Sequence, residues 1–144
     1  MKPKADRRET RMPLNWGDEY VTGCVQVDQQ HRVIFDAMNS LEDLLAKRAF
    51  ESTAVLNLLA QIVDDTINHF ACEEQCMSRR RCSAARDNET AHAGFLETIA
   101  AFQERLREEG PSEPLLREFH STAESWLRAH ICQVDVRLRE CAKG

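Results

Sequence analysis

The chain has 144 residues, which is the length of one ordinary domain and is enough to bury a core without disulfide staples. Its composition, 30% charged and 42% hydrophobic, is typical of a soluble globular protein, and its net charge of -5 argues against a nucleic-acid partner. No hydrophobic segment is long enough to cross a bilayer and the N-terminus carries no apolar signal region, so we expect a cytoplasmic protein with no membrane partner.

Residues 1–26 contain two prolines and two glycines and are expected to form an extended N-terminal arm over a single helical domain, residues 27–144. In that domain apolar residues recur every three or four positions in four long runs, and no run alternates with a period of two. This pattern predicts an all-α protein. The short connections between the runs favour antiparallel neighbours, which predicts an up-down-up-down four-helix bundle.

The first two runs each place a histidine on their apolar side. The first begins after Asp28, a good N-terminal cap, and has the stripe His31, Ile34, Phe35, Met38, Leu41 and Leu45. The second is entered through Ser52 and Thr53 and has the stripe Val55, Leu59, Ile62, Thr66, His69, Glu73 and Cys76. Because His69 and Glu73 are four residues apart they share one helix face, whereas Glu74 is expected to turn toward solvent.

The last two runs have the same arrangement. The third has Asp87 as its expected cap, Gly110–Pro111 as its stop, and the stripe Asn88, His92, Phe95, Ile99, Phe102 and Leu106. The fourth begins near Ser112 and has the stripe Leu116, Phe119, Ala123, Trp126, Leu127, His130, Ile131 and Val134. Asp135 lies five residues beyond His130, about 140° around an ideal helix, so the two are expected to reach one site only from its flanks.

Histidines and acids on these stripes indicate a metal site. One histidine on an apolar face is usually a hydrogen-bonded core residue, but this chain has four, one per predicted helix, together with two acids. A buried carboxylate without a partner loses several kcal/mol of solvation, roughly, and a bound cation removes that penalty. Imidazole suits transition metals, and carboxylates can bridge two ions. We therefore expect a pair of ions in the bundle core, held by His31, His69, Glu73, His92, His130 and Asp135.

The motifs around these residues resemble those of the bacterial hemerythrins, and the resemblance runs from Trp16 to the end of the last helix. They are W-x-x-x-Y (16–20), D-x-Q-H (28–31), H-F-x-x-E-E-x-x-M (69–77), H-x-x-F (92–95) and W-L-x-x-H-I-x-x-x-D (126–135). The resemblance implies a four-helix bundle that binds two iron ions, joined by an oxo or hydroxo bridge and two carboxylates. It also implies reversible binding of O2.

The resemblance assigns each candidate residue a role. His31 and His69 would hold the iron that receives O2, His92 and His130 would hold the second iron, and Glu73 and Asp135 would bridge the pair. The apolar O2 pocket of the family has counterparts here that would exclude water and protons, so that O2 is released instead of being reduced. These counterparts are Ile34, Phe70, Trp126, Leu127 and Ile131.

One ligand of the family is missing. The family has H-x-x-x-H where this chain has Asn88 four residues before His92, and a carboxamide oxygen is a poorer ligand for iron than imidazole. The second iron site is therefore expected to be weakened, with either Asn88 or a water completing it. His120 lies ten residues before His130, off the line of the site, and is expected to be structural or on the surface.

Three functions remain open from the sequence. The favoured one is reversible binding of O2, or of NO, for transport, storage or sensing. The alternative is a di-iron peroxidase or oxidase, or a labile-iron redox sensor, in which the position at Asn88 admits peroxide or another small molecule. The third is an interaction module with an empty site. A sensory role would require a separate signalling partner.

The sequence also contains six cysteines and two basic segments. No C-x-x-C pair occurs and the chain is not a small secreted one, so we expect reduced thiols. Cys76 and Cys132 are favoured as small core residues, with redox-active thiols near the site as the alternative. The basic residues 1–11 and 79–81 are expected to be a solvated tail and loop.

Overall fold

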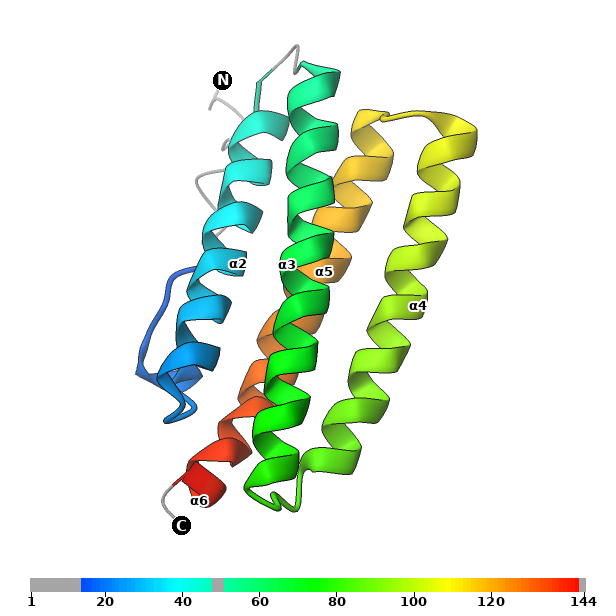
Figure 1. The fold of residues 1–144 in the computed structure, drawn as a ribbon. Coiled ribbons are helices and arrows are strands. Elements are labelled where there is room, and N and C mark those ends of the chain that lie inside the picture. Colours follow the sequence, from blue (N-terminus) through cyan, green and yellow to red (C-terminus); the bar gives the residue numbers. More distant parts are fainter. Residues whose placement is uncertain (1–13, 48–50, 143–144) are drawn as a thin grey trace, which may run out of the picture.

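The protein is a bundle of four long helices that alternate in direction, as the sequence predicts (Figure 1). The computed structural model describes residues 14–47 and 51–142; residues 1–13, with the basic tail and half of the expected arm, lie outside the described residues. The long helices are α2 (Val25–Leu45), α3 (Ser52–Arg79), α4 (Ala85–Glu109) and α5 (Glu113–Gln133). The short ones are η1 (Asp18–Tyr20), η2 (Asp135–Arg137) and α6 (Leu138–Ala142). Strands are absent from the described part of the chain, and none of its helices could span a membrane.

The apolar stripes of the four helices meet in a main core, and a smaller buried cluster that includes Cys76 and Met77 lies near the end of α3. Most of the predicted stripe residues are buried in the main core, among them Phe35, Met38 and Leu41 of α2 and Leu116 of α5. Burying such side chains stabilises a fold by roughly 1.5–3 kcal/mol each, which makes the stripes the main force that holds the helices together. The core therefore fixes the rotation of each helix, and with it the direction in which the histidines point.

Two of the predicted helix starts are wrong by a few residues. Helix α2 begins at Val25 with Cys24 as its N-cap, and Asp28 instead lies in the first turn, where it accepts hydrogen bonds from the backbone N–H and the hydroxyl of Thr22. Helix α4 begins at Ala85, and Asp87 forms an ion pair with Arg137. Both acids sit in a first helical turn, where the helix dipole favours negative charge. From the sequence alone, an acid in the first helical turn is easily mistaken for an acid at the N-cap.

The start of α5 agrees with its prediction. Ser112 is the N-cap and its side chain accepts a hydrogen bond from the backbone N–H of Leu115. The preceding helix α4 ends at Glu109 with Gly110 as its C-cap, whose φ of 78° is a conformation that other residues rarely adopt. The turn between α4 and α5 is thus specified by local chemistry.

The described part of the arm packs on α2. The backbone of Leu14 forms two hydrogen bonds with the side-chain amide of Asn39, and Leu14 and Tyr20 are buried in the main core. Arg139 of α6 donates hydrogen bonds to the backbone carbonyls of Asp18 and Val21. These contacts attach both ends of the described chain to the same side of the bundle.

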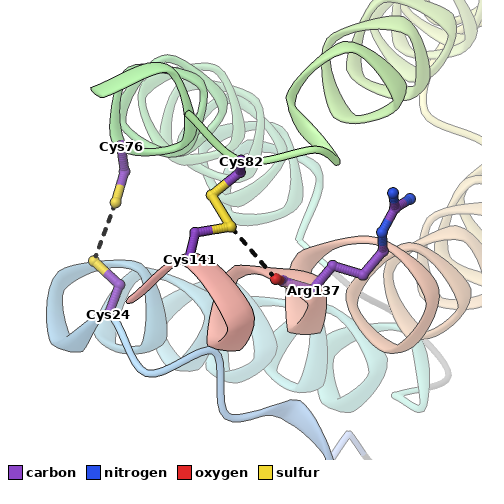
Figure 2. The surroundings of a disulfide bond; sticks show 5 residues. All are labelled: Cys24, Cys76, Cys82, Arg137 and Cys141. Atoms are coloured by element: carbon purple, nitrogen blue, oxygen red, sulfur yellow. Dashed lines mark hydrogen bonds between the residues drawn. A yellow bond between two sulfur atoms is a disulfide. The ribbon is translucent and has the colours of Figure 1, made fainter. Parts of the chain in front are cut away.

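The expectation of six reduced thiols is wrong for Cys82 and Cys141, which form a disulfide (Figure 2). They are 59 residues apart in the chain, but the turn after α3 and the short α6 bring their Cα atoms within 5.5 Å. The other four cysteines are free: Cys24, Cys72, Cys76 and Cys132. Cys132 is exposed, so its expected role as a small core residue is wrong, whereas Cys76 is buried as expected.

Candidate metal centre

All six predicted metal ligands lie toward the end of the bundle at which α2 and α4 begin and α3 and α5 end. His31 is the seventh residue of α2, and His92 is the eighth residue of α4. His69 and Glu73 lie in the second half of α3, and His130 lies in the last turn of α5. Antiparallel packing aligns these positions at a similar height. The long runs that predicted the helices therefore also position the site.

The ligand atoms form two groups that share both carboxylates. The first group consists of His31, His69, Glu73 and Asp135, which each offer one atom, and these four atoms lie within 4.8 Å of one another. The second group consists of Glu73, His92, His130 and Asp135, whose ligand atoms also lie within 4.8 Å of one another. All six side chains are buried. Two adjacent cation sites with the carboxylates between them fit this arrangement.

Each carboxylate directs one oxygen toward each group. Oε2 of Glu73 lies 3.4 Å from Nε2 of His69 and 3.6 Å from Nε2 of His31, while its Oε1 lies 3.2 Å from Nε2 of His92. Oδ2 of Asp135 lies 3.1 Å from Nε2 of His31, and its Oδ1 lies 2.9 Å from Nε2 of His130. This is the geometry in which a carboxylate can bridge two ions.

Asp135 reaches the site because the last helix does not continue to it. Helix α5 ends at Gln133, Val134 stays in the right-handed helical region but with a φ of -117°, and Asp135 opens the tighter helix η2. The 140° offset expected for an ideal helix therefore does not apply. The local change of backbone turns the Asp135 carboxylate into the core, directly against His130.

The hydrogen bonding of the site is incomplete in a way that suits cations. Among the described residues, no hydrogen-bond partner is found for either ring nitrogen of His31 and His92, for either oxygen of Glu73, or for Oδ1 of Asp135. Buried polar atoms without partners are costly and are rare in native proteins. Imidazole nitrogens and carboxylate oxygens are ligands for divalent transition metals, so the residues present fit a metal pair.

The pKa directions favour the forms that bind metal. Burial lowers the pKa of His69, although the nearby Glu73 carboxylate opposes the effect, so the imidazole tends to be neutral. Burial alone would raise the pKa of Glu73, but interactions with His69 and His92 outweigh it and hold the pKa well below its ordinary value. Neutral imidazole and ionised carboxylate are the states that a metal ligand must adopt.

Neighbouring side chains orient the ligands. Nδ1 of His69 lies 2.8 Å from Oε1 of Gln30, so Nε2 points to the site. A hydrogen bond of this kind fixes the ring of a metal-binding histidine. The candidate site residues did not include Gln30, although it immediately precedes His31 in the D-x-Q-H motif. They also omitted Glu74, which is partly exposed while Glu73 is fully buried, and whose Oε1 lies 3.8 Å from Nδ1 of His92.

Asn88, the predicted departure from the family pattern, lies beside the second group. It is fully buried, and its Oδ1 is 2.9 Å from Nε2 of His130. Its Nδ2 is without a hydrogen-bond partner among the described residues. The carboxamide thus occupies a position beside the ligand atoms of His130 and Asp135. The geometry brings it close enough to offer its oxygen to an ion in the second group.

The five predicted pocket residues lie in one apolar cluster, with Ile34, Phe70, Leu127 and Ile131 buried and Trp126 partly buried against them. Their two aromatic rings face the second group. Phe70 stacks on His92 with ring centroids 3.7 Å apart, and Trp126 stacks on His130 at 4.3 Å. Trp16 of the arm lies near His31, with the centroids 6.2 Å apart. Apolar rings thus border both groups.

His120 lies away from the two groups, as expected. It is buried between α5 and α2, where Nε2 is 3.0 Å from the backbone carbonyl oxygen of Met38. Its Nδ1 lies 3.4 Å from Oε2 of Glu42 and 3.5 Å from Oε2 of Glu124. His120 therefore links two helices and has a structural role.

The fold and the site together define a class of protein: a four-helix bundle with a buried histidine–carboxylate centre for cations. The family profile of the hemerythrin HHE cation binding domain matches residues 22–138, and the chain belongs to the hemerythrin family. It is 29% identical over 118 residues to a bacteriohemerythrin of Stenotrophomonas maltophilia, covering 82% of this chain and 74% of the relative. A bacteriohemerythrin of Pseudomonas aeruginosa matches with the same identity and coverage.

Similarity extends to animal proteins and to solved structures. A myohemerythrin of Riftia pachyptila is 27% identical over 131 residues, covering 91% of this chain and 95% of the relative. A crystal structure of wild-type hemerythrin superposes with a TM-score of 0.78 at 23% sequence identity, covering 91% of this chain and 98% of that one. The structural likeness confirms the four-helix fold.

Proposed function

We propose that this protein binds two iron ions and, through them, reversibly binds O2 or a similar diatomic molecule such as NO. The observation that carries the proposal is that Glu73 and Asp135 each direct one oxygen to each of two histidine groups. Membership of the hemerythrin family supports iron as the metal. When bound, two ferrous ions would supply the electrons that let O2 bind and leave again.

The residues of the chain would have distinct tasks in this function. His31, His69, Glu73 and Asp135 would offer four protein atoms to the first ion, two fewer than a six-coordinate ion takes, which leaves room for a small ligand. His92 and His130 would hold the second ion. The apolar cluster that includes Ile34 would exclude water and stray protons from the site, so that bound O2 leaves as O2.

The test is reconstitution of the full chain with ferrous iron under anaerobic conditions. Absorption spectra are recorded before air, after air and after evacuation. We expect a visible band that appears with air and disappears under vacuum over several cycles. A band that never reverses would overturn the proposal. Glu73→Gln is the variant that should lose the band, because it removes the charge of a bridging carboxylate.

A second function is favoured by one observation at Asn88. Its carboxamide replaces an imidazole beside His130, and a weaker ligand in the second group would give peroxide a place to react. Under this alternative the protein is a di-iron peroxidase or a labile-iron redox sensor, and sensing would need a separate signalling partner. This alternative would be favoured over reversible binding of O2 if the protein turns over added hydrogen peroxide repeatedly with an electron donor and is oxidised irreversibly by air.

The cytoplasmic location inferred from the sequence stays a proposal. The disulfide between Cys82 and Cys141 bears on it, because such bonds are rare in reducing compartments. Fractionation of cells that express the full chain, with labelling of its free thiols at lysis, would test the location and the state of the bond together.

A further inference from the structure

A second pair of cysteines lies beside the disulfide. The Sγ atoms of Cys24 and Cys76 are 3.7 Å apart although the residues are 52 positions apart in the chain (Figure 2). We propose that Cys24 and Cys76 form a disulfide when the protein meets peroxide, and that this bond locks α2 to α3. This inference does not depend on the proposed binding of O2.

Cys24 and Cys76 both border a hollow between α2 and α3. The hollow has a volume of about 360 Å³, and its walls are Cys24, Gln26, Cys72, Cys76, Arg79 and Arg80. Cys24 is partly exposed, whereas Cys76 is buried. An oxidant that enters the hollow therefore meets Cys24 first, with Cys76 behind it as the thiol that can complete the bond.

The local environment suits this division of tasks. Cys24 is the N-cap of the 21-residue helix α2, and its side chain lies on the solvent side of the pair. Burial raises the pKa of Cys76, and the neighbouring Arg79 and Arg80 only partly oppose this. Cys76 thus tends to stay protonated until the sulfur of Cys24 has been oxidised.

The chemistry balances with hydrogen peroxide as the oxidant. The Cys24 thiolate attacks one peroxide oxygen and the O–O bond breaks, which gives a sulfenic acid and, after protonation, one water. The sulfur of Cys76 then attacks the sulfur of Cys24, the S–O bond breaks, and the hydroxyl leaves with a proton as a second water. Two thiols are oxidised to one disulfide while one peroxide is reduced to two waters.

The bond requires only a small movement. A disulfide has an S–S distance of about 2.05 Å, so the two sulfurs must approach by about 1.7 Å. Cys24 has an extended backbone and follows Gly23, whose φ is 86°, so the adjustment can occur before α2 begins. The neighbouring bond between Cys82 and Cys141 already ties the turn after α3 to α6.

The expected effect is a stiffer metal-binding end of the bundle. Cys24 lies seven residues before His31, and Cys76 lies three residues after Glu73. A cross-link between them would fix the separation of the two helices that supply the first histidine group. The melting temperature of the oxidised chain should rise by roughly 5 °C or more, because a long loop is closed in the unfolded state.

The experiment is peptide mapping of the full chain, with iron bound and after removal of iron by a chelator. Each form receives one equivalent of hydrogen peroxide, or of the thiol oxidant diamide, and is then alkylated, digested and analysed by mass spectrometry. We expect a linked Cys24–Cys76 peptide as the main product in both forms, loss of two of the four free thiols, and the rise in melting temperature.

Matched variants make the result decisive. Cys24→Ser keeps a good N-cap residue, so α2 should still form, and it should lose both the linked peptide and the thermal shift. Cys132→Ser, which removes an exposed cysteine elsewhere, should change neither. The proposal is overturned if Cys72 is the main partner of either sulfur, if Cys24 and Cys76 stay reduced while Cys132 is oxidised, or if the bond forms without thermal stabilisation.

Discussion

At the scale of single residues, the site depends on a few side chains that the sequence singles out through their spacing. His69 and Glu73 could be predicted to share a face because they are one helical turn apart, and the structure brings them within 3.4 Å. The approach of Asp135 could not be predicted from ideal geometry, because the backbone change at Val134 depends on how the chain packs after α5. Gln30 was missed because its role depends on a contact 39 residues away.

The first residue-scale prediction concerns Asn88. Asn88→His should strengthen binding of the second iron by roughly tenfold or more and slow oxidation of the ferrous protein by air, because imidazole is a better iron ligand than a carboxamide. Competition with a chelator measures the affinity for iron, and stopped-flow absorption measures the rate of oxidation by air. Asn68→His, on the exposed side of α3, is the matched control and should alter neither. Unchanged affinity and rate in Asn88→His would contradict the assigned role.

The second concerns two adjacent acids of α3. Glu73→Gln should reduce iron from two ions per chain to one or none, because both oxygens of Glu73 lie among the histidines. Glu74→Gln should keep two ions with at most a modest loss of affinity, since Glu74 approaches only Nδ1 of His92, at 3.8 Å. Metal analysis after gel filtration compares the two, and circular dichroism checks that both fold. Equal iron content in the two variants would rule out the bridging position of Glu73.

At the scale of helices, the periodicity of the apolar residues predicted four elements because it reports directly which face is buried. Helix ends were predicted well where a local signal specifies them, as at Ser112 and Gly110. They were predicted poorly at Asp28 and Asp87, because an acid is equally suited to the cap and to the first turn. Tertiary contacts with Thr22 and Arg137 decide between those positions.

The turn between α4 and α5 gives a prediction at this scale. Gly110→Ala should lower the free energy of unfolding by about 1 kcal/mol, because Gly110 has a φ of 78° that alanine adopts only with strain. Gly94→Ala, inside α4, should raise it by about 0.5–1 kcal/mol, because alanine is the better helix former. An added Cβ meets no neighbouring atom within 4 Å at either position, so the two substitutions differ only in the backbone conformation of the glycine that they replace. Urea unfolding measures both, and changes of the same sign would contradict this explanation.

At the scale of the whole molecule, two kinds of feature differ in how far the sequence predicts them. The bundle follows from pattern and short connections, which are local. The disulfide between Cys82 and Cys141 does not, since 59 residues separate the cysteines and no spacing motif marks them. The pairing exists only because α6 folds back against the turn after α3, which is a property of the assembled chain.

The disulfide leads to a prediction for the stability of the whole chain. Cys82→Ser should lower the free energy of unfolding by about 2–4 kcal/mol under non-reducing conditions, because the bond restricts a long loop in the unfolded state. Cys132→Ser should change it by no more than about 0.5 kcal/mol. Urea unfolding of both variants measures the difference. A count of six free thiols in the unreduced, denatured chain would show that the bond does not form.

The central claim is that one chain holds two iron ions between two histidine groups that share two carboxylates. The direct measurement is an anaerobic titration of the metal-free full chain with ferrous iron, with bound iron and protein quantified in the same sample. The account predicts saturation at two iron ions per chain, and at one or none in Glu73→Gln. Saturation of the unmodified chain at one ion, or uptake of zinc with no uptake of iron, would contradict it.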